Sequence, residues 1–209
     1  FDGCEVECCY HGWRFDQGGT CTAIPSLVEG QHFNLERVKV QSFPLRESRG
    51  CLWIWHGDAQ GSGEDLPPPP EIPALDDGQM RIVETMRFPC DIDHAVVGLM
   101  DPAHGPYVHQ SWWWRSRHSM HEKAKGFAPT EQGFQMVRHR PSSNSFAYKL
   151  LGGAPETEIR FRLPGLRFEH ITTSKYTVVG LTAVTPLREG ETEVNHLIYW
   201  DVPWLPPFT

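Results

Sequence analysis

The chain has 209 residues, 39% hydrophobic and 22% charged, which is long enough for a sizeable core and for two domains. Its formal net charge of −7 argues against a nucleic-acid surface, which would show a basic patch. No apolar run approaches the roughly 18 residues that span a bilayer. The first residues lack the basic start and apolar stretch of a signal peptide. We therefore expect no nucleic-acid partner and no membrane span.

Residues 1 to about 57 have the pattern of an all-β region. The stretches "CEVEC" from Cys4 and "VKVQSFPL" from Val38 alternate as strands do, and "CLWIWHG" from Cys51 predicts a buried aromatic strand. The stretch "DAQGSGEDLPPPPEIP" follows, and its four consecutive prolines favour an extended spacer. We place a first domain at 1–60, a proline-rich linker at 61–77 and a second domain at 78–209.

The second domain is expected to open with the strand "QMRIVETMRFP". In "DIDHAVVGLMD" the apolar residues fall at i, i+3, i+4, i+7 and i+8, which predicts one apolar helical face that ends before Pro102. Five strands are then predicted, with a hairpin turn at 188–191: "FQMVRHR", "ETEIRFRL", "LRFEHITT", "KYTVVGLTAVTPL" and "TEVNHLIYWDV". The expected fold class is α+β, a small β domain followed by a long antiparallel sheet with at least one helix.

A metal-ligand pattern, C-x-x-H, lies near the start of the chain at Cys8 and His11. Taken alone it is also compatible with a structural zinc site or with buried thiols. Over its whole length, however, "CCYHGWRFDQGGTCTAIP" resembles the second half of the Rieske iron–sulfur motif, in which two cysteines hold one iron of a [2Fe–2S] cluster and two histidines hold the other. The resemblance implies that Cys8 and His11 are cluster ligands and that Cys9 is not. Cys4 and Cys21 lie outside the pattern, and we expect them to be buried thiols.

The other half of this motif, Cys-x-His, is expected about sixteen residues before Cys8. That interval includes position 1, so we expect the chain to begin inside its own metal site and to be a fragment. Tyr10 stands where respiratory-chain Rieske proteins place a disulfide cysteine, so the motif resembles the oxygenase and ferredoxin branch.

A second constellation, D-x-x-H-x4-H, consists of Asp101, His104 and His109. Two histidines five apart on an unbroken helix would point about 140° apart, but Pro102 and Gly105-Pro106 interrupt the helix. The pattern resembles the mononuclear iron motif of Rieske non-haem iron oxygenases, the ring-hydroxylating large subunits. The resemblance implies that His104 and His109 bind Fe(II) and that Asp101 is the carboxylate bridging to a Rieske histidine of a neighbouring subunit.

The third iron ligand in that family is an Asp on a late helix, which this chain does not match. Asp201 is the nearest late Asp, but "YWDVPW" indicates a strand and loop, so we do not assign it. By resemblance, the fold is the C-terminal part of an all-β Rieske domain followed by a helix-grip-like catalytic domain, truncated at both ends.

The function that the resemblance implies is the oxygenase component of a Rieske system, a mono- or dioxygenase that hydroxylates or demethylates an aromatic or polycyclic substrate with O₂ at Fe(II). Electrons would come from NAD(P)H through a separate reductase or ferredoxin, and the [2Fe–2S] cluster would relay them. The expected assembly is a homotrimer in the bacterial cytoplasm or a plastid. Two alternatives are a Rieske-type electron carrier and a non-catalytic, zinc-stabilised binding module.

Other polar and aromatic stretches are given weaker interpretations. The aromatic run "SWWWR" from Ser111 fits core or interface packing better than a substrate pocket. His118 and His121 fit a solvated loop. The arginines of "RHR" at 138–140 are compatible with an anion site or with a charged strand edge. Asp91 and His94 are candidates for orienting the metal ligands.

Overall fold

The computed structural model describes residues 3–57, 66–72, 80–108, 124–141 and 152–204. The chain divides into two compact units, Phe1–Pro70 and Glu71–Thr209. Among the helices that the structure describes, none has the length and apolar character that crossing a membrane requires.

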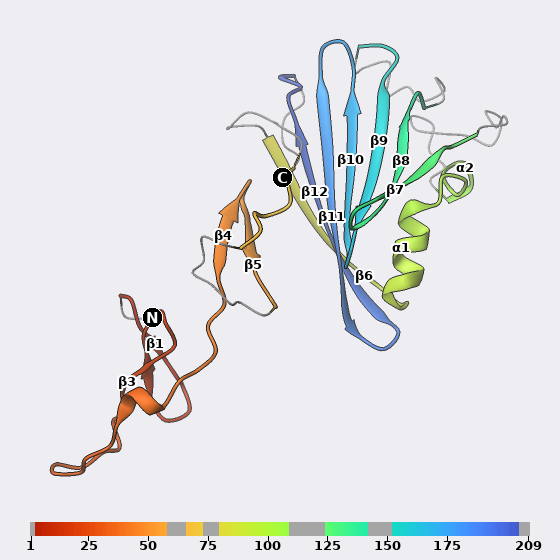
Figure 1. The fold of residues 1–209 in the computed structure, drawn as a ribbon. Helices are drawn as coiled ribbons and strands as arrows, with labels where there is room; N and C mark the ends of the chain where they lie inside the picture. Colours follow the sequence, from red (N-terminus) through yellow and green to blue (C-terminus); the bar gives the residue numbers. More distant parts are fainter. Residues whose placement is uncertain (1–2, 58–65, 73–79, 109–123, 142–151, 205–209) are drawn as a thin grey trace. The chain divides into compact units, whose positions relative to one another are not determined.

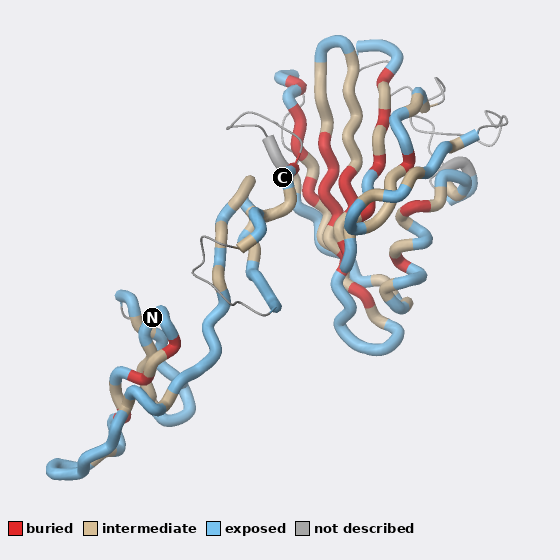
Figure 2. Tube along the Cα trace, viewed as in Figure 1, coloured by how far each residue is buried: buried red, intermediate tan, exposed pale blue. Residues whose placement is uncertain are grey.

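The first unit consists of two small antiparallel sheets and one short 3-10 helix. The elements are β1 (Val6–Glu7), β2 (Arg14–Phe15), β3 (Cys21–Ala23), η1 (Leu35–Arg37), β4 (Leu45–Ser48) and β5 (Cys51–Ile54). The sheets are β1-β2-β3 and β4-β5. Most of this unit is exposed or half-buried, whereas buried residues of the second unit gather along its strands (Figure 2). Cys21 and Ile24 are among the few buried side chains of the first unit.

Two strand predictions for this unit are wrong in part. The stretch from Val38 forms one bridge, between Thr20 and Lys39, and only its last residue, Leu45, belongs to a described strand, β4. The strand from Cys51 does form as β5, but it is not buried, because Leu52 is 70% exposed and Ile54 64% exposed.

The second unit is built on a seven-stranded antiparallel sheet in the order β6-β12-β11-β10-β9-β8-β7 (Figure 1). Its strands are β6 (Met80–Phe88), β7 (Phe127–Thr130), β8 (Gly133–His139), β9 (Glu156–Arg162), β10 (Leu166–Thr172), β11 (Thr177–Arg188) and β12 (Glu191–Trp200). Six of these seven correspond to predicted strands, and the turn between β11 and β12 falls at the predicted residues. The strand that the sequence did not predict, β7, lies at the edge of the sheet.

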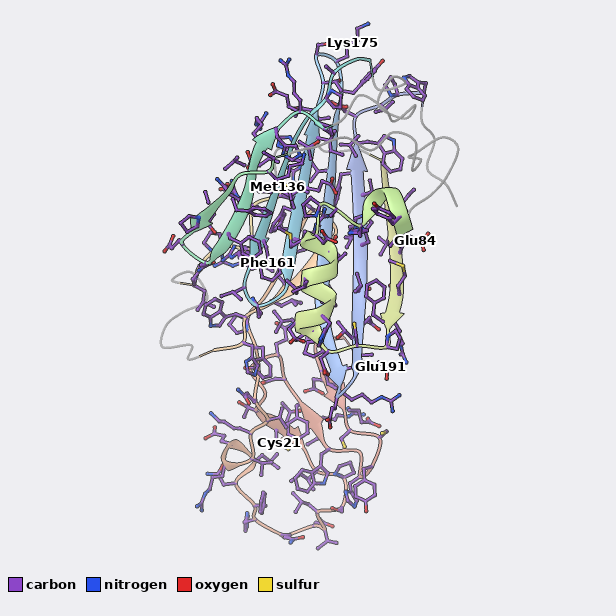
Figure 3. The ribbon with its side chains drawn as sticks, turned by 90° about the vertical axis from the view of Figure 1, so that its right-hand side faces the viewer. Cys21, Glu84, Met136, Phe161, Lys175 and Glu191 are labelled. Atoms are coloured by element: carbon purple, nitrogen blue, oxygen red, sulfur yellow. The ribbon has the colours of Figure 1, made fainter. Side chains whose placement is uncertain are left out.

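Helix α1 (Ile92–Met100) packs across one face of this sheet (Figure 3). At its first turns Ala95 packs with Val184 and Val194 of β11 and β12. At its end Met100 packs with Met136, Ile159 and Phe161 of β8 and β9. The predicted apolar face is therefore the face that α1 buries, and the α+β prediction is confirmed.

The end of α1 carries the chain to the second candidate motif. Helix α1 ends at Met100, one residue before Asp101, and a short helix α2 (Gly105–Val108) follows His104. Pro102 lies between the two helices, as expected for a residue that ends a helix.

Candidate metal-binding sites

Cys8 and His11 lie in the turn that joins β1 to β2. The strands pair Val6 with Phe15 and Glu7 with Arg14, and an ion pair of 3.1 Å links the latter two side chains. The turn is closed by two backbone hydrogen bonds of 2.8 Å, from Cys8 N to Trp13 O and from Gly12 N to Cys8 O. The first candidate pair is thus placed on a defined turn.

Gly12 is required by the backbone of this turn. Its φ is +72°, and an added Cβ would lie 3.3 Å from Cγ of Pro25. Both a left-handed conformation and a close neighbour therefore favour glycine here. Cys8 and His11 are both exposed, so their thiol and imidazole can be reached from outside the turn. This donor set fits the part of a Rieske [2Fe–2S] cluster that one Cys and one His would hold.

The remaining cysteines of this region differ in their surroundings. Cys21 is buried, as expected, and its thiol lies 3.6 Å from the carbonyl oxygen of Ala23. Cys4 is exposed, so the expectation of a buried thiol is wrong for this residue. It precedes β1 in a turn, where no strand covers it within the described part of the unit.

Asp101 and His104 are brought together directly after α1. The Oδ2 atom of Asp101 lies 3.7 Å from Nδ1 of His104. The other carboxylate oxygen, Oδ1, accepts a 2.7 Å hydrogen bond from the backbone N–H of Ala103. The backbone holds one carboxylate oxygen, and the other is the one near the imidazole, at an ion-pair distance that is longer than a hydrogen bond. A carboxylate placed in this way orients a metal-binding histidine.

The second histidine of this motif, His109, lies outside the described residues. So do the predictions for His118, His121 and the tryptophans at 112–114. Within the described residues, no three His, Cys, Asp or Glu side chains are grouped so that they could hold a metal ion. The donor atoms of Cys8, His11 and His104 are of the types that bind a [2Fe–2S] cluster and Fe(II). Among the described residues, each site has only part of its ligands.

Three weaker candidates have contacts within the fold. Asp91 accepts a 2.6 Å hydrogen bond from the N–H of Gly190, which joins the start of α1 to the β11–β12 turn. His94 lies 3.2 Å from Asp93, its neighbour in the sequence. Asp201, the residue after β12, accepts a 2.6 Å hydrogen bond from the N–H of Thr177 at the start of β11, which agrees with leaving it unassigned.

The two arginines of "RHR" face carboxylates on β9. Arg138 lies 3.7 Å from both Glu156 and Glu158, and Arg140 lies 3.7 Å from Glu156. These ion pairs account for the positive charge of this strand end by interactions within the sheet.

Sequence reasoning missed a polar group on the sheet face that α1 covers, which we call the Arg167 cluster: Arg167, Glu169, Thr182 and His196. Nη2 of Arg167 donates a 3.0 Å hydrogen bond to Glu169, and Oγ1 of Thr182 lies 2.8 Å from Nδ1 of His196. A signal was present, because His196 interrupts an otherwise apolar series between Val194 and Ile198 at every second residue.

Two histidines of the sheet are perturbed by their surroundings. Burial lowers the pKa of His196, the Arg167 guanidinium lowers it further, and Glu169 opposes the shift. Burial also lowers the pKa of His170, with Arg138 acting in the same direction and Glu158 against it. Both side chains therefore favour the neutral form more than an exposed histidine does.

Residues 1–44 match the family model of the Rieske [2Fe-2S] domain. Chlorophyllide a oxygenase from Arabidopsis thaliana is 32% identical over 110 residues, which cover 51% of this chain and 18% of that protein. The oxygenase component of dicamba O-demethylase from Stenotrophomonas maltophilia is 32% identical over 111 residues, covering 51% of this chain and 30% of that protein. The aligned segments thus span less than a third of the length of these relatives.

Two solved structures share the fold. NdmA of Pseudomonas putida CBB5 with caffeine has a TM-score of 0.70 at 16% identity and covers 97% of this chain and 57% of that one. Dicamba monooxygenase bound to dicamba has a TM-score of 0.68 at 20% identity, and the match covers 95% of this chain and 60% of that one.

The Cys8–His11 turn thus lies within the part of the first unit that matches a Rieske [2Fe–2S] domain. With a sheet-rich second unit and these relatives, the chain is a relative of the Rieske non-haem iron oxygenases.

Proposed function

We propose that this chain is part of the oxygenase component of a Rieske non-haem iron system. The observation that carries the proposal is the 3.7 Å contact between Asp101 and His104, in a chain whose residues 1–44 match a Rieske domain. The proposed ligands are Cys8 and His11 for the [2Fe–2S] cluster and His104 and His109 for the mononuclear iron. The proposed domains are 1–60 and 78–209, with a linker at 61–77.

When bound, the cluster would supply electrons, and Fe(II) would activate O₂ beside an aromatic or polycyclic substrate that is hydroxylated or demethylated. The chain's own residues hold and orient these groups. Asp101 lies beside Nδ1 of His104, and Nε2 is the ring nitrogen that we propose binds the metal. In a trimer, the same carboxylate would face a Rieske histidine of the neighbouring subunit.

The partners in this proposal are a reductase or ferredoxin and two further copies of the chain. The proposed location is the bacterial cytoplasm, with a plastid as the alternative, since relatives include a Stenotrophomonas maltophilia enzyme and a chloroplastic enzyme of Arabidopsis thaliana.

The test compares two variants of the full-length protein, Asp101→Asn and Asp93→Asn. Both remove one carboxylate from the same region, but the side chain of Asp93 is exposed and contacts only its neighbour His94 among the described residues. We expect Asp101→Asn to abolish reductase-dependent O₂ consumption while the EPR signal of the reduced Rieske centre and the iron content stay as in the wild type. Asp93→Asn should leave all three unchanged.

Full O₂ consumption in Asp101→Asn would contradict the role of this carboxylate. A wild-type protein with a Rieske signal but no mononuclear Fe(II) would favour the electron carrier. Colourless protein with stoichiometric zinc would favour the binding module.

A further inference from the structure

The Arg167 cluster lies on one face of the sheet, on three neighbouring strands. Arg167 of β10 is directly opposite Thr182 of β11, which is directly opposite His196 of β12. Residues opposite each other in an antiparallel sheet project to the same side. Val184 and Val194, which pack with Ala95 of α1, lie two residues further along β11 and β12 and so share that side. The cluster therefore belongs to the face that α1 partly covers.

Gly180 leaves room for the imidazole within this cluster. Gly180 is directly opposite Glu169, and an added Cβ would lie 3.2 Å from Cε1 of His196. The ring therefore leans over a strand position that has no side chain, beside the carboxylate that pairs with Arg167.

The cluster contains a buried donor that the protein does not use. The side chain of Arg167 is only 10% exposed, and its Nε makes no hydrogen bond among the described residues. A buried N–H without a partner costs on the order of 1–3 kcal/mol. Such groups in native proteins usually bond a water or a ligand.

The cluster lies one strand away from the end of α1. Met100 packs on Ile159 and Phe161 of β9. On β10, Glu169 is directly opposite Ile159 and Arg167 directly opposite Phe161. The residue before Asp101 thus rests beside the Arg167–Glu169 pair. In Figure 3, Met136 and Phe161 mark this side of the helix, and Glu84 of β6 marks the opposite edge of the sheet.

The charges of the cluster decide which ligand it suits. Glu169 already balances Arg167 at 3.0 Å, and the pKa of His196 is lowered, so the group is close to neutral as a whole. A ligand carboxylate placed here would add a buried negative charge without a counter-charge, which is unfavourable. An uncharged acceptor bonds a buried N–H without that cost.

We propose that the Arg167 cluster binds an uncharged hydrogen-bond acceptor, such as a ketone or amide carbonyl, of the planar substrate. This inference rests on the proposed function, because it assigns the cluster to the substrate of the same site. Nε of Arg167 donates to the carbonyl oxygen. The cluster thus selects neutral carbonyl compounds over their carboxylates.

The test measures binding and needs neither electrons nor O₂, so it can fail while the oxygenase proposal stands, and it can succeed if turnover is never seen. The probes are 9-fluorenone, fluorene and 9-fluorenecarboxylate, titrated against the full-length protein by ligand-observed NMR. We expect the ketone to bind about tenfold more tightly than fluorene, as one hydrogen bond to a buried charged donor allows. The carboxylate should bind most weakly.

The variants separate recognition from structure. Arg167→Lys keeps the charge but removes the Nε donor and should abolish the preference for the ketone. Its matched control is Arg160→Lys on β9, because Arg160 pairs with Glu158 at 3.1 Å, also two residues away, and is exposed. Glu169→Gln should strengthen carboxylate binding several-fold, which a purely structural role of Glu169 would not cause.

Three results would overturn the inference: no saturable binding of the ketone to the wild type, equal binding of ketone and fluorene, or a ketone preference that survives Arg167→Lys. The first two would mean that a water satisfies the arginine. If Arg167→Lys does not fold, the Glu169→Gln variant decides. An affinity for 9-fluorenecarboxylate that is the same in Glu169→Gln as in the wild type would then refute the assignment.

Discussion

The contact at the end of α1 gives the sharpest stability prediction. Met100 is 7% exposed and packs on Met136, Ile159 and Phe161, whereas Val97 on the same helix is 69% exposed. Truncating a buried methionine removes its transfer free energy and leaves a cavity, which together cost roughly 2–5 kcal/mol. We expect Met100→Ala to lower the free energy of unfolding of the second unit by about 3 kcal/mol, near the middle of that range. Val97→Ala should change it by less than about 0.5 kcal/mol.

The assay is urea unfolding followed by far-UV circular dichroism, whose signal comes mainly from the long strands of the second unit. A fall in the midpoint at an unchanged slope would show lost stability without a change in the surface exposed on unfolding. Equal losses for both variants, or a Met100→Ala protein as stable as the wild type, would refute the packing of this helix on β8 and β9.

Three further changes have defined directions. Gly98→Ala should raise the melting temperature, because the added Cβ meets nothing within 4 Å and alanine favours a helix by about 1 kcal/mol over glycine. Gly133→Ala should lower it strongly, since the Cβ would lie 2.2 Å from the carbonyl oxygen of Phe161. Because the pKa of His196 is lowered in the folded protein, the unfolded protein binds a proton at this imidazole at a higher pH than the folded protein does. The contribution of His196 to the free energy of unfolding is therefore complete above about pH 6.5 and falls as the pH decreases below that value. His196→Gln should make that decline shallower in urea midpoints measured between about pH 7.5 and 5, and an unchanged decline would contradict this origin.

The fold of the second unit was predictable because its periodic patterns are long. Strands β11 and β12 run over 12 and 10 residues rich in β-branched and other apolar side chains, and α1 shows the helical spacing over two turns. The missed strand, β7, is short and contains Pro129, a residue that argues against a central strand. Its place at the sheet edge is where proline is tolerated.

The first unit was harder to predict, because alternation indicates a strand only when a partner strand exists. Val38 and Val40 alternate with Lys39 and Gln41, yet Val40 is exposed, and among the described residues only the single bridge of Lys39 to Thr20 forms there. The apolar β5 was predicted as buried, but it belongs to a two-stranded sheet, which offers one neighbour and leaves Leu52 and Ile54 exposed.

At the candidate sites, spacing predicted which residues are neighbours only where the chain is locally constrained. Asp101 and His104 meet across one turn, and Cys8 and His11 share a hairpin. The Arg167 cluster joins residues from three strands, and its members come together through the register of the sheet. No local pattern in the sequence sets that register, so the cluster could be found only in the structure.

The connectivity of the sheet has a consequence for the order of assembly. Strands β8 to β12 follow one another in the chain and pair as successive neighbours, so their contacts are short-range, whereas β6 pairs with the last strand, β12. Closing a long loop is entropically costly and is delayed until the chain that forms its other end exists. During synthesis, β6 must wait until the ribosome has released β12. Helix α1 also packs on β11 and β12 through Ala95, so the segment that carries Asp101 and His104 is synthesised well before the sheet that supports it is complete.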